Sequence, residues 1–158
     1  ENLSCKTSVV ACVRQTCCAN IMLASECAME KINFKLPHPI SIWKAYGRRG
    51  ARVQFKTKEY KKFIEQSFFM MRSQKVILPK GEAYALRITL CSPDWRTKKG
   101  TIAKKDAENY VKTLSDTIVS YFNTINFKFD DSQIVELLVI KKDDTTKHAL
   151  VELEVIRF

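Results

Sequence analysis

The segment "QIVELLVIKKDDTTKHALVELEVI", Gln133–Ile156, decides the fold class of this chain. Its first ten residues are mostly apolar, which predicts a buried strand. Residues 149–156 alternate between apolar and polar side chains, which predicts a second, half-buried strand. A polar turn near Asp143–Lys147 separates the two runs, so we expect them to pair as an antiparallel hairpin.

The residues upstream of this segment predict strands that alternate with helices. Apolar alternation or content indicates strands around residues 32–36, 52–55 and 84–90. Helical spacing of apolar side chains indicates helices over residues 58–72 and from residue 107 onward. Some consecutive strands are thus expected to be joined by a short turn, and others to be separated by a helix. This order predicts an α+β domain with a mixed β-sheet covered by helices on at least one face.

The charge of the chain points to a polyanionic partner. The 158 residues carry a net charge of +10, and the basic excess lies entirely within residues 29–158. Nucleic acid is the favoured partner, because the chain has no basic amphipathic helix and no lipidation signal. No apolar run is long enough to span a membrane, so a membrane role is excluded and a cytoplasmic, nucleoid-associated location is expected.

The first 28 residues differ from the rest and are interpreted as an N-terminal extension to a domain of residues 29–158. Five of the six cysteines lie in the first 27 residues, at irregular spacings. Neither a disulfide framework nor a zinc motif has this distribution, so reduced thiols in a cytosolic-type protein are expected.

Two acidic patches stand out within the basic domain: "KKDAENYVK", Lys104–Lys112, and "FDD", Phe129–Asp131. Each has an ordinary structural interpretation. Asp106 can cap a helix, Glu108 can pair with Lys112 at i,i+4, and "DD" can form a turn. Together, and beside several lysines, the patches instead suit a magnesium–phosphate site, because Mg²⁺ prefers hard oxygen ligands.

The motifs and their order resemble the RusA-type Holliday junction resolvases. The resemblance spans Ile32–Val155 and rests on three segments: "INFKLPHPISIWKAYGRRGARVQFKTKEYKKF", "PDWRTKKGTIAKKDAENYVKTLSD" and "FKFDDSQIVELLVIKK". It implies a RusA-like fold and a magnesium-dependent, structure-selective endodeoxyribonuclease, with manganese as an alternative cation. Such an enzyme resolves four-way DNA junctions by paired nicks in recombination and repair.

The resemblance also assigns roles to individual residues. Asp106 and Glu108 match the two metal-binding carboxylates, Asn109 a supporting amide and Lys112 the catalytic lysine. Asp131 matches a downstream catalytic and metal-binding aspartate, and its acidic neighbour Asp130 is a further candidate metal ligand. Two departures are visible: Glu replaces Asp at position 108, and the stretch between Lys112 and Asp130 is about four residues longer, close to one helical turn.

The basic segments and the aromatic residues complete the predicted interface with branched DNA. The DNA-binding residues expected from these segments are Arg48, Arg49, Arg52, Arg96, Lys98, Lys99, Lys104 and Lys105. Trp43, Tyr46 and Trp95 are candidates for stacking on a base, with burial in the core or a dimer contact as the alternatives. A homodimer is expected, both from the two-fold symmetry of the substrate and from the Phe- and Met-rich helix 58–72.

Two other functions remain open from the sequence. One is a junction- or duplex-binding module whose catalysis is weakened or lost through the change at Glu108. The other is a nuclease of similar chemistry that acts on RNA or on DNA flaps.

Overall fold

The computed structural model describes residues 30–49 and 53–157. The predicted extension, residues 1–28, lies outside the described residues. The elements follow in the order β1 (Lys31–Pro37), α1 (Ile42–Ala45), β2 (Tyr46–Arg49), β3 (Val53–Lys56), α2 (Lys58–Ser73), β4 (Ala83–Cys91), η1 (Pro93–Trp95), α3 (Glu108–Thr124), η2 (Asp131–Gln133), β5 (Ile134–Lys142) and β6 (His148–Ile156).

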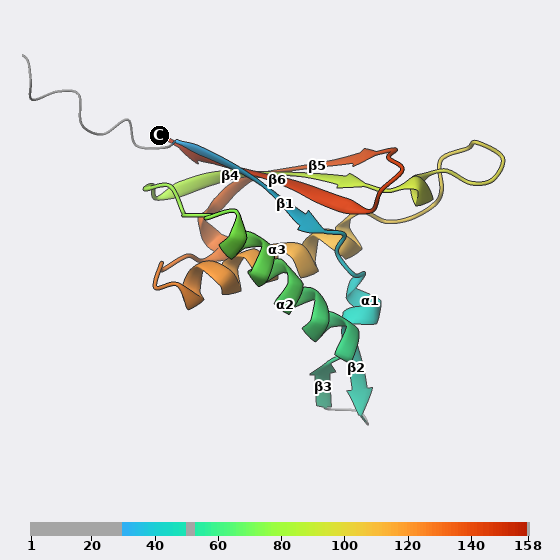
Figure 1. Ribbon diagram of the computed structural model, residues 1–158, viewed down its shortest axis with the longest axis horizontal. Coiled ribbons are helices and arrows are strands. Elements are labelled where there is room, and N and C mark those ends of the chain that lie inside the picture. Colours follow the sequence, from blue (N-terminus) through green and yellow to red (C-terminus); the bar gives the residue numbers. More distant parts are fainter. Residues whose placement is uncertain (1–29, 50–52, 158) are drawn as a thin grey trace, which may run out of the picture.

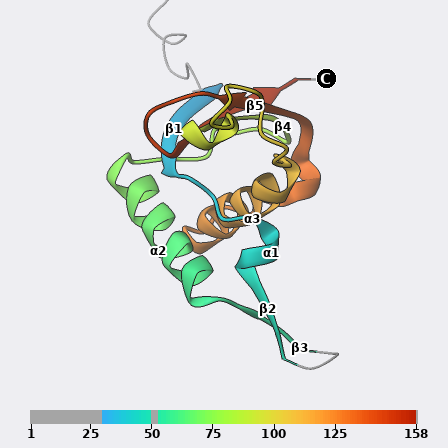
Figure 2. The same cartoon turned by 90° about the vertical axis from the view of Figure 1, so that its right-hand side faces the viewer.

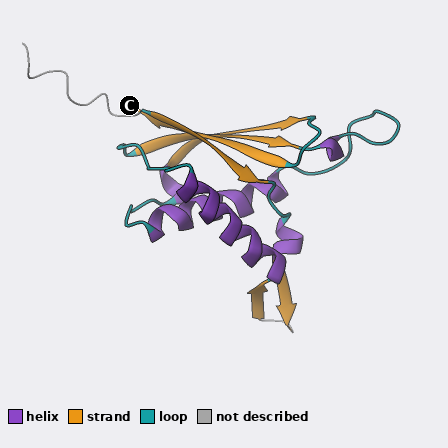
Figure 3. Ribbon diagram, viewed as in Figure 1, coloured by secondary structure: helices purple, strands orange, loops and turns teal. Residues whose placement is uncertain are grey.

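A mixed sheet and two long helices form the body of the molecule. The sheet has the strand order β1-β6-β4-β5, in which only β4 and β5 run parallel. Helices α2 and α3 lie against one face of the sheet, as Figures 1 and 3 show. The predicted α+β class, with helices on at least one face of a mixed sheet, is confirmed.

The expected hairpin between the last two strands is wrong. β6 lies between β1 and β4, and β5 pairs with the far side of β4. The connecting turn, residues 143–147, therefore crosses the end of β4. Five residues suffice for this crossing, because two inter-strand spacings measure about 10 Å and one extended residue spans about 3.3 Å. β4 is central because every second side chain along it enters the core: Tyr84, Leu86, Ile88 and Leu90 are all buried.

The expectation that residues 133–142 form a buried strand is also wrong. β5 is an edge strand, and Val135, Leu137 and Leu138 are 47%, 55% and 48% exposed. An apolar run does not by itself distinguish a central strand from an edge strand, because that difference depends on where the chain places its neighbours.

The basic segment 46–52 is not wholly a loop. Its first half forms β2, which pairs antiparallel with β3 and projects away from the body, as Figures 1 and 2 show. The side chain of Phe55 in β3 lies so close to Gly47 that a Cβ at position 47 would be 2.5 Å from it. Glycine therefore allows the two strands to pair at this register.

The apolar periodicity predicted for the two long helices is confirmed. Thr57 caps α2 by accepting a hydrogen bond from the Tyr60 amide. In α3, the buried apolar side chains are Val111, Leu114, Ile118, Tyr121 and Phe122. Most of the Phe and Met side chains that were expected to form an apolar surface on α2 instead pack into the core. Phe63 and Met71 are buried, and Phe68 and Met70 are partly buried. Phe69 is exposed.

Candidate active site

The first turn of α3 positions the first acidic patch. The helix begins at Glu108, and its N-cap is Ala107, which makes no side-chain capping hydrogen bond. Asp106 therefore does not cap the helix, contrary to that structural interpretation. Within the part of the chain that the structure describes, the carboxylates of Asp106 and Glu108 have no hydrogen bond and no ion pair. Both carboxylates are exposed and free to bind a ligand.

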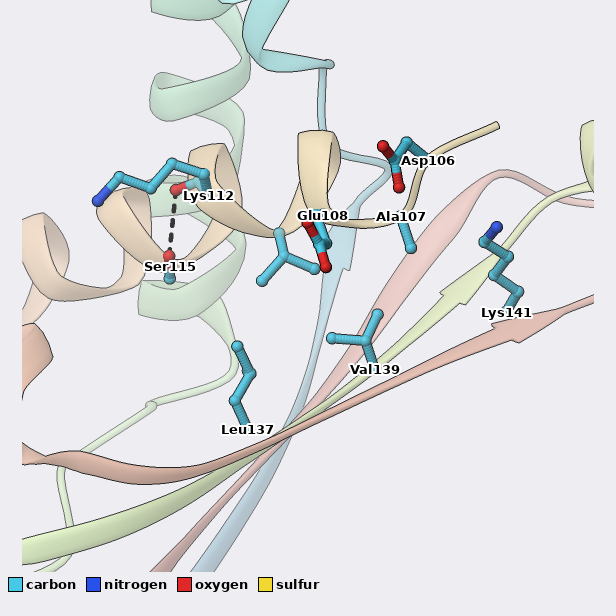
Figure 4. Close-up of a pocket in the computed structure, with 9 residues that line it drawn as sticks. Asp106, Ala107, Glu108, Lys112, Ser115, Leu137, Val139 and Lys141 are labelled. Atoms are coloured by element: carbon cyan, nitrogen blue, oxygen red, sulfur yellow. Dashed lines mark hydrogen bonds between the residues drawn. The ribbon is translucent and has the colours of Figure 1, made fainter. Parts of the chain in front are cut away.

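The first acidic patch faces β5 across an open groove of about 640 Å³. Asp106, Glu108 and Lys112 line the groove from the start of α3, and Leu137, Val139 and Lys141 line it from β5, as Figure 4 shows. The groove exists because the helices cover the other strands and leave the edge strand open. Its two walls differ in character: the α3 wall is charged and the β5 wall is mostly apolar.

Lys112 lies between two carboxylates, and neither is Glu108. Its Nζ atom is 2.9 Å from Asp116 Oδ1 and 4.0 Å from Asp131 Oδ2. The hydrogen bond to Asp116 is the main cause that raises the pKa of Lys112 above its ordinary value. The expected Glu108–Lys112 pair is therefore wrong. Asp116 was not among the predicted residues, although its i+4 spacing from Lys112 was a usable signal.

The second acidic patch forms the start of η2, and its two aspartates differ in their contacts. The Asp130 side chain accepts a hydrogen bond from the Ser132 amide, and the Gln133 side chain accepts one from the Asp130 amide in a capping box. The Ser132 bond lowers the pKa of Asp130 below its ordinary value. Asp131 instead presents its carboxylate to Lys112 and is 67% exposed at the side chain.

The structure joins the two patches through Lys112 and does not gather all their carboxylates at one point. Among the described residues, the one group of three His, Cys, Asp or Glu ligand atoms within 4.8 Å of one another is Cys91, Asp144 and His148. Asp106, Glu108 and Asp131 are therefore not all within that distance. Asp106 and Glu108 share the groove, while Asp131 lies beyond Lys112.

Two further polar residues belong to this region. Asn109 is the second residue of α3 and is half-buried. Lys141 was not predicted: its Nζ donates a hydrogen bond of 2.5 Å to the Lys105 carbonyl and lies 5.3 Å from the centre of the Trp95 ring. Sequence spacing carried no signal for it, because only the position of β5 brings Lys141 to the groove.

The predicted DNA-binding residues fall into free and paired groups. Arg48, Lys98, Lys99 and Lys104 are exposed, and within the described ranges none of them forms an ion pair. Arg96 is paired with Asp143, and Lys105 lies 3.7 Å from Asp94. Arg52 and the side chain of Arg49 lie outside the described residues.

The three aromatic candidates for base stacking differ in their burial and contacts. Trp95 is buried and donates a 2.7 Å hydrogen bond to the Leu90 carbonyl, and Tyr46 packs edge-to-face on the Tyr60 ring. Both therefore stabilise the fold. Trp43 on α1 is 77% exposed and is available for a contact with a partner.

A comparison with known families identifies the family of the chain. The model of the family described as endodeoxyribonuclease RusA matches residues 37–155 of the 158. The chain therefore belongs to the RusA endodeoxyribonuclease family, which indicates a nuclease of the Holliday junction resolvase class. A search of curated proteins gave no match. None of the helices in the described residues is long and apolar enough to cross a bilayer.

Proposed function

We propose that this protein is a magnesium-dependent endonuclease that resolves four-way DNA junctions by paired nicks. The observation that carries the proposal is the groove beside α3. There, two carboxylates that have no hydrogen bond or ion pair among the described residues, Asp106 and Glu108, line the same groove as Lys112, on a basic protein of the RusA family.

The residues of the groove fit a magnesium ion. Mg²⁺ is usually held by one or two carboxylates, substrate phosphate oxygens and water. Asp106 and Glu108 supply two carboxylates with no competing hydrogen bond among the described residues. Glu108 is one methylene longer than an aspartate, and its place on the first turn of α3 lets the longer side chain reach the groove that Asp106 also lines. Manganese has the same ligand preference and is the alternative cation.

Each side chain then has a distinct task in phosphodiester hydrolysis. Asp106 and Glu108 would hold the cation, which would supply a Lewis acid for the phosphate and a bound water of lowered pKa. Lys112, whose ammonium group contacts Asp116 and Asp131, would stabilise the charge that develops on the phosphate oxygens in the transition state. The N-terminus of α3, which has no side-chain cap, adds a favourable dipole toward the phosphate.

The exposed cations would hold the DNA backbone on both sides of the groove. In Figure 1, the start of α3 lies between the projecting loop that carries Lys98 and Lys99 and the β2–β3 hairpin that carries Arg48. Contacts of this kind give affinity without sequence selectivity. They therefore suit an enzyme that selects the shape of a junction. Trp43 adds an exposed ring for stacking on an unpaired base.

We propose that β5 is the dimer interface. The free edge of β1 is blocked, because the Gln74 side chain accepts a 2.8 Å hydrogen bond from the Lys35 amide and donates one of the same length to its carbonyl. The edge at β5 carries exposed Leu137 and Leu138 and has no such cover among the described residues. Unprotected apolar edge strands pair readily with another chain. A dimer through β5 would also bring two grooves near the two-fold axis, as paired nicks require.

The alternative is a junction-binding module that has lost catalysis through the glutamate at position 108. It predicts the same basic surface and the same affinity for DNA. The two functions differ only in whether the carboxylates support hydrolysis.

The test is nicking of a synthetic four-way junction with magnesium, beside binding measured in calcium. Asp106→Asn and Glu108→Gln should each abolish nicking, because each removes an anionic ligand of the cation. Asp131→Asn should slow nicking, because it removes one of the two carboxylates that hold Lys112. All three should keep or strengthen binding, since each removes a negative charge that faces DNA. Asp130→Asn is the matched control and should be milder, because Asp130 is engaged in the η2 cap.

Two results would count against the proposal. Absence of nicking by the unmodified protein with magnesium or manganese would favour the binding module. Normal nicking by Asp106→Asn and Asp131→Asn would remove both residues from the active site.

A further inference from the structure

A second cluster of ligating side chains lies away from the groove, where the turn between β5 and β6 crosses the end of β4. Ligand atoms of Cys91, Asp144 and His148 all lie within 4.8 Å of one another. The three donors are a sulfur, an oxygen and a nitrogen, unlike the oxygen donors of the groove. We propose that these three residues form a binding site for Zn²⁺ or a similar borderline-soft divalent ion.

The backbone places two of the ligands directly beside each other. Cys91 and His148 are opposite residues in the antiparallel β4–β6 ladder, so their side chains emerge on the same face of the sheet. This face is opposite to the one that α2 and α3 cover, because the neighbouring Leu90 and Ala149 point into the core. Both Cys91 and His148 are buried, so their positions are set by packing.

The third ligand comes from the crossing turn. Asp144 is half-buried and is held by its own turn, since its Oδ1 atom accepts a 3.1 Å hydrogen bond from the Thr146 amide. The turn is tied to the chain that leaves β4 through Arg96–Asp143 and through Lys147–Asp94 at 2.6 Å. Asp144 is therefore held over the end of β4.

The hydrogen bonds around His148 favour a free lone pair. The Thr146 hydroxyl oxygen lies 3.2 Å from Asp144 Oδ1 and 3.0 Å from His148 Nδ1. A hydroxyl has one proton, so donation to Asp144 makes Nδ1 the donor of the second bond. In that tautomer the lone pair lies on Nε2, and the Thr146 bond fixes the orientation of the ring, as a second hydrogen bond does for zinc-binding histidines.

The distances suit the size of the ion. Zinc bonds of about 2.0–2.3 Å in tetrahedral geometry separate ligand atoms by about 3.3–3.8 Å. Atoms already within 4.8 Å reach this separation through small side-chain rotations. Three protein ligands leave the fourth position for water. Binding would release the thiol proton of Cys91, because the thiolate is the form that ligates a metal.

The site would stabilise the start of the segment, residues 92–105, that leads from β4 to the groove. The chain leaves Cys91 through η1 and the basic loop to reach Asp106 at the groove. An ion bound by Cys91, Asp144 and His148 would cross-link β4, β6 and the crossing turn at the point where that segment begins. Because the donors include sulfur, this site and the groove would take different metals.

The test uses cobalt, which reports sulfur ligation through a thiolate-to-metal charge-transfer band. The five cysteines outside the described residues would obscure the signal, so the full-length chain is used with Cys5→Ser, Cys12→Ser, Cys17→Ser, Cys18→Ser and Cys27→Ser. Cys91 is then the single thiol. One equivalent of Co²⁺ should produce the band, one equivalent of Zn²⁺ should displace it, and excess Mg²⁺ should not.

Matched variants in the same background test each ligand. Asp144→Asn lies in the turn and should weaken Co²⁺ binding at least tenfold without unfolding the protein, as should His148→Gln. Glu136→Gln, the same change of a carboxylate to an amide at an exposed residue near the start of β5, should bind like the background chain. The proposal is overturned if no charge-transfer band develops, or if Asp144→Asn and Glu136→Gln bind Co²⁺ equally. This readout does not depend on nuclease activity.

Discussion

Lys112→Ala should separate catalysis from binding more cleanly than any other substitution. Its ion pairs with Asp116 and Asp131 are exposed, with 54% of the Lys112 side chain accessible, so their loss should cost only about 0.2–1 kcal/mol of stability. Val111 and Leu114 are buried on the same helix and anchor it independently of Lys112. The variant should therefore fold normally at 25 °C.

The effect on the rate should be much larger than the effect on affinity. Removal of one positioned donor that acts on transition-state charge typically lowers a rate by about 100- to 1000-fold. Loss of a single phosphate contact should weaken binding by about tenfold or less and reduce the salt dependence by about one unit of slope. Nicking should therefore fall far more than the Kd rises.

The assay is single-turnover nicking of a four-way junction at saturating protein, beside gel-shift affinity in calcium at several salt concentrations. Lys98→Ala is the control, because Lys98 is exposed on the basic loop and is not among the residues that line the groove. It should weaken binding and leave the saturated rate almost unchanged. If Lys112→Ala and Lys98→Ala change the rate and the affinity in the same ratio, Lys112 is only part of the basic surface.

Three further predictions concern the assembly, the extension and the pH dependence. Leu138→Lys on β5 should convert a dimer of 18.2 kDa chains to a monomer, as measured by light scattering. Leu150→Lys is the control, because Leu150 is similarly exposed but lies on the interior strand β6, and it should leave the dimer intact. A monomeric unmodified protein would contradict the β5 interface. A chain that begins at Met29 should keep the thermal stability and junction affinity of the full chain, and a large loss of either would show that residues 1–28 belong to the domain. Burial lowers the pKa of His38 in the folded protein below 6.5. The stability that neutral His38 contributes is therefore fully present above pH 6.5, and it is lost as the pH falls through the pKa of His38 in the folded state. As the pH falls below 6.5, the free energy of urea unfolding should therefore fall less for His38→Phe than for the unmodified chain. An unchanged pH profile would contradict this prediction.

Much of the local structure followed from the sequence because it depends on local periodicity. The alternation around Phe34 and Leu86 predicted β1 and β4, and the spacing of Tyr60 and Leu114 predicted the two long helices. The acidic and basic motifs likewise identified the family, because motif order is a property of the chain and not of its packing.

The tertiary structure decided everything that depends on which segments become neighbours. A short polar turn predicted a hairpin between the last two strands, yet β4 lies between them, because its buried side chains fill the middle of the sheet. That insertion leaves β5 exposed at the edge and places Lys141 at the groove. It also brings Cys91 beside His148 and Asp144, which are more than fifty residues away in the sequence. Local sequence patterns indicate which face of a segment is apolar, but they do not identify the other segment that covers this face. That segment is determined by packing across the whole domain.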